Sequence, residues 1–287
     1  MAVADDKVGH VRAYLEYFRD MGVHDFYRNE TLEAVELPVA VEAEVRAVVA
    51  AEPAKVVPTA QPVTVFETLT PTELNIAKLV SFNDLAPMPS ARVPAELRVA
   101  ALEAISKDIG DCTRCPLAYG GRRKIVFGNG DPNARLMFVG EGPGADEDEQ
   151  GVPFVGKSGQ LLNNMIGAMG LRREDVYVAN IEKCRPPANR APEPVEANTC
   201  TQFLLRQMDV VQPEVVVALG ATAAMYLLGV KQTLASLRGE WHSARGVKVA
   251  VTYHPAFLLR DPRQKGEAWK DLQRVMAEMH LVAPKRP

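Results

Sequence analysis

Four cysteines are the side chains of this 287-residue sequence that are best suited to holding a metal. Cys112 and Cys115 form a C-x-x-C, and Cys184 and Cys200 follow with fifteen residues between them. In a reducing compartment, four cysteines indicate a metal site or a redox pair. A thioredoxin-like pair fits poorly, because Cys112 precedes the first predicted strand and two cysteines stay unexplained. One zinc ion, one iron–sulfur cluster and four unrelated buried thiols are the alternatives that the spacing leaves open.

A second pattern with chemical meaning is GVPFVGKS at 151–158, which matches the phosphate-binding sequence G-x-x-x-x-G-K-[ST]. A phosphate-binding loop follows a strand directly and offers successive backbone N–H groups to the phosphates. Here an acidic run at 146–149 precedes the loop, and Pro153 has no N–H. The predicted strands also lack a terminal Asp for magnesium. The match is therefore coincidental, and the sequence does not predict a nucleoside triphosphatase.

The elements that position these residues alternate along the chain. Four short apolar runs predict buried strands, at 135–140, 175–180, 214–220 and 247–254. Helical patterns lie between and after them, near 157–169, 194–211, 221–229 and 266–280. Strands that alternate with helices predict an α/β fold, with a four-stranded parallel sheet between two helical layers.

Polar residues and glycines stand where these predicted strands end. Glu141-Gly142-Pro143-Gly144 follows the first strand, Asn180 and Gly220 end the second and third, and His254 ends the fourth. Parallel sheets bind their ligands at the carboxyl ends of the strands. The sequence therefore predicts the functional site at this edge.

The rest of the chain divides into three predicted segments. Residues 1–35 carry apolar side chains at helical spacing and predict an amphipathic helical segment, which could pack on the protein itself or engage a protein partner. Residues 36–92 are rich in Ala, Val, Pro, Glu and Thr, and predict a flexible linker. Residues 93–287 are the predicted domain, opening with a helix at 93–110. Neither a secretory signal nor a membrane-length apolar stretch is recognisable, so we expect a cytoplasmic protein without membrane partners.

Charge is distributed unevenly between the two parts of the chain. Residues 1–111 hold 10 basic and 18 acidic residues, whereas residues 112–287 hold 23 and 18. The second part can approach a polyanion that the first part would repel. This balance permits nucleic-acid binding without establishing it.

Several motifs together resemble the family-4, iron–sulfur uracil-DNA glycosylases. The resemblance covers roughly residues 100–280, and each motif gains its specificity from the order and spacing of the others. They are C-x-x-C-P at 112–116, V-G-E-G-P-G at 139–144, G-x-P-F-V-G-x-S-G-x-L-L at 151–162, N-I-x-K-C-R-P-P-x-N-R-x-P at 180–192, V-A-L-G at 217–220 and H-P-A at 254–256. The resemblance implies a DNA-repair enzyme that excises uracil and leaves an abasic site. It also implies a [4Fe-4S] cluster held by Cys112, Cys115, Cys184 and Cys200.

The resemblance assigns roles at the strand ends. A glycosylase must turn uracil out of the base stack to reach its glycosidic bond. Phe154 would stack on the base, and Asn180 would face N3–H and O4, which tells uracil from cytosine. His254 would donate to O2, where negative charge develops as uracil departs. Gly142 and Gly144 would expose backbone N–H groups to the base or to phosphate.

The remaining site predictions are a water-positioning carboxylate and the DNA contacts. Glu141 and Glu147 are the carboxylates, since the first motif carries Gly142 where the best-known uracil-DNA glycosylases have an Asp. Phe257 and Leu258 are predicted to enter the base stack as a wedge. Candidate contacts to the DNA backbone are Lys157, Ser158, Arg185, Arg190 and Arg260.

Two other functions fit parts of this pattern. One is a uracil-DNA binder that keeps its product, as in a related subgroup with a histidine-bearing basic loop. The corresponding loop here, RPPANRAPEP at 185–194, has no histidine, which favours turnover. The other is a cluster-bearing DNA-binding module, which would not need Phe154, Asn180 and His254 to converge.

Overall fold

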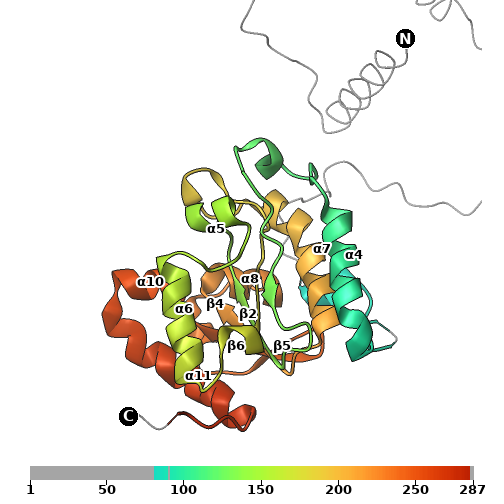
Figure 1. Ribbon diagram of the computed structural model, residues 1–287. Coiled ribbons are helices and arrows are strands. Elements are labelled where there is room, and N and C mark those ends of the chain that lie inside the picture. The colour runs from blue at the N-terminus through green and yellow to red at the C-terminus, as the bar shows by residue number, and fades with distance from the viewer. Residues whose placement is uncertain (1–80, 90, 285–287) are drawn as a thin grey trace, which may run out of the picture. The chain divides into compact units, whose positions relative to one another are not determined.

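A six-stranded sheet organises the protein, for which a computed structural model describes residues 81–89 and 91–284 (Figure 1). The strands run in the order β1-β3-β2-β4-β6-β5. The four central strands are parallel, and the edge strands β1 and β5 pair antiparallel to their neighbours. Their bounds are β1 Asn129–Gly130, β2 Leu136–Gly140, β3 Tyr177–Asn180, β4 Val215–Leu219, β5 His242–Ala244 and β6 Val247–Thr252. The predicted four-stranded parallel sheet is confirmed, with two short edge strands added.

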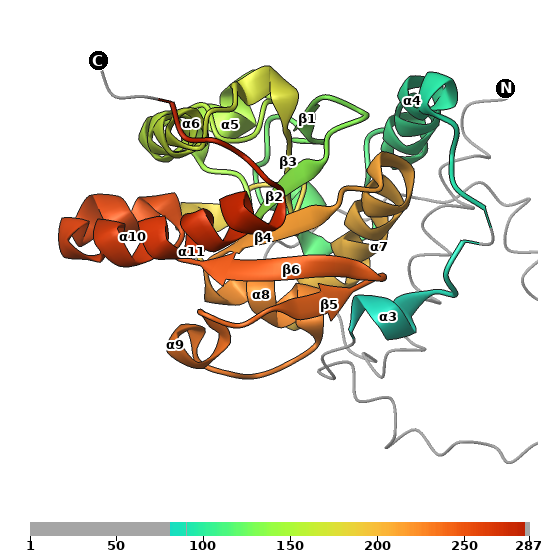
Figure 2. The same cartoon turned by 90° about the horizontal axis from the view of Figure 1, so that it is seen from below.

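Helices cover both faces of the sheet. Successive side chains of a strand point to opposite faces, so each strand contributes to two hydrophobic cores. In β2, Met137 and Val139 belong to one hydrophobic core, and Leu136 and Phe138 belong to the other. The first core is shared with α4 (Arg98–Ile109), α7 (Pro194–Val211) and α8 (Ala221–Leu228). The second is shared with α6 (Lys157–Ala168) and α11 (Lys265–Glu278). Figures 1 and 2 show α4 and α7 side by side, and the predicted three-layer α/β/α arrangement is confirmed.

Short helices carry the chain between these main elements. They are α5 (Ala145–Gln150), α9 (Leu234–Leu237) and α10 (Pro255–Arg260), with 3-10 turns at 95–97, 116–119, 173–175, 187–189 and 262–264. Both α5 and α10 follow strand ends directly, so they help to frame the carboxyl edge of the sheet. Among the helices of the described residues, none combines the length and the apolar character that crossing a membrane requires.

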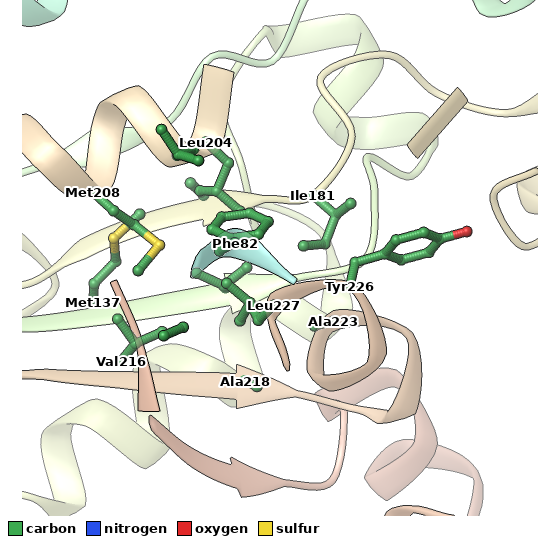
Figure 3. Packing of buried hydrophobic residues seen from close by; sticks show 14 of the residues in the cluster. Phe82, Met137, Ile181, Leu204, Met208, Val216, Ala218, Ala223, Tyr226 and Leu227 are labelled. Atoms are coloured by element: carbon green, nitrogen blue, oxygen red, sulfur yellow. The ribbon is translucent and has the colours of Figure 1, made fainter. Parts of the chain in front are cut away.

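A short helix, α3 (Phe82–Leu85), lies within the segment that the sequence predicted to be linker. Its Phe82 is 0% exposed and belongs to the first hydrophobic core. Figure 3 shows the ring among Leu204, Met208 and Leu227. The linker prediction is therefore wrong for residues 81–89, and the domain begins before residue 93. Residues 1–80, with the predicted helical segment and most of the predicted linker, lie outside the described residues.

Arg245 provides a second anchor for the same segment. Its guanidinium donates to the carbonyl oxygens of Ala86 and Pro87 and pairs with the carboxylate of Asp209. Its backbone N–H donates to Oδ1 of Asn83 at 2.6 Å. Arg245 is buried, and these acceptors satisfy a charge that would otherwise be costly to remove from water. Residues 82–87 are thus bound to the domain through both apolar and polar contacts.

We predict that Phe82→Ala lowers the free energy of unfolding by about 3–5 kcal/mol, the usual cost of emptying a fully buried aromatic site. Met88→Ala is the matched control, because Met88 belongs to the same segment but is 55% exposed. Urea denaturation of both variants measures the difference. An equal, small effect of the two substitutions would show that residues 81–89 do not contribute to the stability of the domain.

Candidate active site

A pocket of about 430 Å³ lies at the carboxyl edge of the sheet, where the sequence placed the site. This volume falls in the usual range for small-molecule sites. The ends of β2, β3 and β6 contribute to it, and so do the loops that follow them. Its lining residues are Glu141, Gly142, Pro143, Gly144, Glu147, Phe154, Ser158, Asn180, Pro186, Asn189, Arg190, His254, Ala256 and Arg260.

Asn180 lines this pocket and carries a buried, unsatisfied acceptor. Its side chain is almost fully buried, and its Oδ1 has no hydrogen-bond partner among the described residues. Gly140 pairs with it in the β2–β3 register. A Cβ at Gly140 would lie 2.5 Å from that Oδ1 and 2.6 Å from Cζ of Phe154. The absence of a side chain at Gly140 therefore allows the amide and the aromatic ring to approach each other.

Phe154 is held in a strained conformation. Its φ is 56°, in the left-handed region that bulky residues rarely adopt. Its backbone is tightly enclosed, since a Cβ at Gly159 would lie only 1.8 Å from its carbonyl oxygen. The ring centroid is 5.6 Å from that of His254, with the planes 34° apart. Such strain costs on the order of 1–3 kcal/mol and is concentrated at functional sites.

His254 is a neutral hydrogen-bond donor in this geometry. It caps the N-terminus of α10, where its Nδ1 accepts from the backbone N–H of Ala256 at 3.1 Å. With Nδ1 accepting, the proton lies on Nε2. Burial lowers the pKa of His254 to about 4, and the positive charge of Arg260 acts in the same direction. The imidazole is therefore uncharged at neutral pH.

The two predicted carboxylates differ in their surroundings, although both line the pocket. Oε2 of Glu147 accepts from the N–H of Gly144, and its Oε1 accepts from those of Val155 and Gly156. Glu147 thereby holds the loop that carries Phe154. Glu141 is partly exposed, and its carboxylate has no hydrogen-bond partner within the described part of the chain.

The predicted phosphate contacts are only partly brought together. Ser158, Arg190 and Arg260 line the pocket, whereas Lys157 is exposed at the start of α6. Arg185 donates to Oδ1 of Asn189 at 2.7 Å, so it supports its own loop.

Arg190 forms an ion pair with a buried acidic residue. Its guanidinium donates to both carboxylate oxygens of the buried Glu196, at 2.7 and 2.6 Å. This bidentate ion pair fixes the 185–193 loop against the start of α7, beside the pocket.

The two residues predicted to form a wedge are less exposed than the residue that follows them. Leu258 is buried, and Phe257 is partly buried with its ring stacked on Tyr253 at 5.2 Å. The next residue, Leu259, is 43% exposed. Leu259 is thus the exposed apolar side chain of α10.

Sequence reasoning missed Pro143, Pro186, Asn189 and Ala256 as lining residues. Pro186 and Asn189 stand within the R-P-P-x-N-R motif, which could have identified them. Pro143 and Ala256 likewise stand beside residues that were selected. Gly140 stands in the V-G-E-G-P-G motif but received no role from it, because its importance comes from contacts made across two strands.

The four cysteines line one small cavity beside α4 and α7. Apolar side chains complete it, from Ile109, Ile125 and Phe203. Three N–H groups donate to sulfur: Arg114 to Cys112 at 3.5 Å, Arg122 to Cys184 at 3.3 Å and the backbone of Lys183 to Cys200 at 3.2 Å. Burial raises the pKa values of Cys115, Cys184 and Cys200, whereas donors and positive charges around the sulfurs act in the opposite direction and favour the thiolate form.

The spacing of the cysteines tests which metal group fits this cavity. A tetrahedral zinc with bonds of about 2.3 Å would bring the sulfurs roughly 3.8 Å apart. In residues 81–89 and 91–284, however, no three Cys, His or acidic side chains gather closely enough for a single ion. A cluster of several irons holds its thiolates further apart. Four cysteines around one cavity supply the thiolate donor set that such a cluster requires.

An aromatic ring, an unsatisfied amide and a neutral imidazole thus meet at the carboxyl edge of an α/β domain that has a second, thiol-lined cavity. The sequence profile described as the Uracil DNA glycosylase superfamily matches residues 127–273. The chain belongs to this superfamily.

Curated relatives agree with this assignment. A type-4 uracil-DNA glycosylase from Thermotoga maritima is 45% identical over 168 residues, which are 57% of this chain and 86% of the relative. The type-4 enzyme from Archaeoglobus fulgidus is 39% identical over 61% of this chain and 92% of its own. The one from Pyrobaculum aerophilum is 42% identical over 60% and 91%.

We predict that the single-turnover rate of base excision shows no inflection near pH 6.5, the ordinary pKa of histidine, because His254 stays neutral down to about pH 4. Its contribution to stability follows the same shift. The folded-state pKa lies below the unfolded value, so this contribution is complete above about pH 6.5 and is lost as the pH falls towards 4. Rates measured from pH 5 to 8 check the prediction. A fall in rate centred on pH 6.5, absent from His254→Asn, would contradict it.

Proposed function

We propose that this protein is a uracil-DNA glycosylase that turns uracil out of DNA and hydrolyses its N-glycosidic bond. The observation that carries the proposal is the unsatisfied Oδ1 of Asn180, buried in a pocket with Phe154 and the neutral His254. A buried acceptor without a partner is costly, and a ligand that donates a hydrogen bond to it removes the cost. Uracil N3–H is such a donor.

Base selection follows from the same amide. Oδ1 of Asn180 accepts from uracil N3–H, and its NH₂ group donates to O4. Cytosine presents an acceptor at N3 and a donor at its exocyclic amine, so both contacts would be mismatched. Sites built on hydrogen bonds reject such analogues strongly, because their buried groups are left unpaired. Phe154 supplies the face on which the flipped base stacks.

Bond cleavage leaves a negative charge on the base. The C1′–N1 bond breaks with its electron pair passing to uracil, water adds to C1′, and the water proton is released. Nε2–H of His254 donates to O2, where part of the charge develops. A preorganised donor in a partly buried site stabilises that charge without reorganisation. The N–H of Gly142 adds to this positive field, whereas the N–H of Gly144, which the sequence also assigned to the base or phosphate, is already donated to Oε2 of Glu147 at 3.1 Å.

Glu141 is the better placed of the two carboxylates to orient water. Its side chain lines the pocket and is not engaged by backbone amides. Glu147 already accepts three such bonds, and its role is to hold the loop of Phe154. We assign Glu141 to the attacking water and Glu147 to positioning.

DNA approaches this edge of the sheet through Leu259, Arg260 and Lys157, which are exposed around the pocket. Leu259 takes the place of the flipped base in the stack, as apolar wedges do. Arg260 and Lys157 contact the DNA backbone.

The four cysteines hold a [4Fe-4S] cluster. When bound, the cluster supplies a rigid crosslink; hydrolysis moves no electrons and needs no redox step. Cys184 and Cys200 bracket the 185–193 loop, which contributes Pro186, Asn189 and Arg190 to the pocket. Fixing both cysteines fixes the ends of a pocket wall.

We predict that the purified protein releases many equivalents of uracil from excess uracil-containing DNA. A time course separates the possible functions. Continued release supports the glycosylase, one equivalent retained on the protein identifies a product-trapping binder, and DNA binding without release identifies a module that lacks catalysis.

Variants of the pocket sharpen this test. Asn180→Ala, His254→Asn and Glu141→Gln should each slow single-turnover excision more than they weaken DNA binding, by on the order of 100- to 1000-fold for His254. Asn keeps the helix cap at position 254 and removes the donor. Lys270→Met, on the exposed side of α11, is the control and should match the parent. Rates within about threefold of the parent would refute the assigned role of that residue.

We also predict about four irons per chain in anaerobically purified protein, with the brown colour of a cluster. Chelation of the iron should lower both thermal stability and excision, because the 185–193 loop loses its anchors. Stoichiometric zinc without iron, in protein that excises uracil, would show that the cavity holds a different metal.

A further inference from the structure

Lys183 lies between the two cavities. Its side chain is 1% exposed, and it stands one residue before Cys184 on the wall of the cysteine cavity. Its Nζ donates to the backbone oxygen of Asn180 at 2.9 Å and to Oε1 of Gln207 at 2.7 Å. Its own backbone N–H donates to Sγ of Cys200 at 3.2 Å. One residue thus contacts both a cluster ligand and the residue that reads the base.

The charge of Lys183 has no carboxylate partner within the described residues. Both acceptors of its ammonium group are neutral amide oxygens. A buried charge is costly, and an opposite charge nearby lowers that cost. The thiolates of the cysteine cavity are anions beside Lys183. Their combined negative charge exceeds the positive charge of an oxidised [4Fe-4S] core, so a bound cluster has a net negative charge. A cluster bound by these cysteines would therefore supply a counter-charge for Lys183.

The same ammonium group fixes Asn180. Gln207, which accepts from Nζ, donates through Nε2 to the backbone oxygen of Phe127 at 3.0 Å and to Oη of Tyr177 at 3.1 Å. The carbonyl of Asn180 is thereby tied through Lys183 and Gln207 to α7 and to the start of β3. This leaves its side chain free to face the pocket.

We propose that Lys183 is a positioning residue, which uses the charge of the cluster to hold Asn180 in the geometry that reads uracil. The proposal rests on the proposed glycosylase function and on the cluster. It predicts that a substitution at position 183 changes both the reduction potential of the cluster and the rate of excision that depends on Asn180.

The test compares Lys183→Met with Asn180→Ala and with the double variant, all loaded with iron. Lys183→Met should slow single-turnover excision by on the order of 10- to 100-fold, as loss of a supporting contact does. In the double variant it should add little to Asn180→Ala, because it acts through Asn180. The reduction potential, measured by voltammetry, should become more negative, since a nearby positive charge is removed. Lys270→Met should change neither quantity.

A second variant covers the case in which Lys183→Met does not retain its cluster. Gln207→Glu keeps Lys183 and gives it a carboxylate partner, so the potential should again become more negative. An unchanged potential in Gln207→Glu, or losses that multiply independently in the double variant, would overturn the proposal. Parent protein that lacks iron or does not release uracil would instead refute the proposed function, whatever Lys183 does.

Discussion

The parallel pairing of β2 with β3 is the contact on which the rest of the site depends. It places Gly140 beside Asn180 and continues past both strand ends, where the N–H groups of Ile181 and Glu182 donate to the oxygens of Gly140 and Glu141. Beyond this pairing, the segment after β2 continues into the base pocket, and the segment after β3 continues to Cys184. A one-residue slip would turn the side chain of Asn180 to the opposite face of the sheet.

Two compartments with opposite requirements meet behind this pairing. The base pocket needs an unsatisfied acceptor and an uncharged donor, so that uracil supplies the missing contacts. The cysteine cavity needs positive charge and N–H donors near sulfur, which Arg114, Arg122 and Lys183 provide. The 185–193 loop starts next to Cys184 and leads back towards Cys200. Metal binding by these two cysteines therefore fixes the position of the loop that forms part of the pocket wall.

Much of this arrangement could be predicted from the sequence. The central strands and α7 have strong apolar patterns, and parallel strands necessarily bring their ends together, so Asn180 and His254 could be located. Phe82 could not, because a four-residue helix has no period to detect. The sequence also could not tell which of the adjacent residues Leu258 and Leu259 is exposed, since adjacent positions on a helix point about 100° apart. The starting phase of α10 depends on its cap by His254, which only the folded structure fixes.

The left-handed backbone of Phe154 has a consequence for protein engineering. Glycine or asparagine would adopt this positive φ at lower cost, but the ring of Phe154 is only 5% exposed and belongs to the second hydrophobic core. Emptying a buried aromatic site costs about 3–5 kcal/mol, more than the roughly 1–3 kcal/mol of strain that the change would relieve. Core packing therefore retains the aromatic residue even without a substrate, so selection for robustness and selection for catalysis favour the same side chain at position 154.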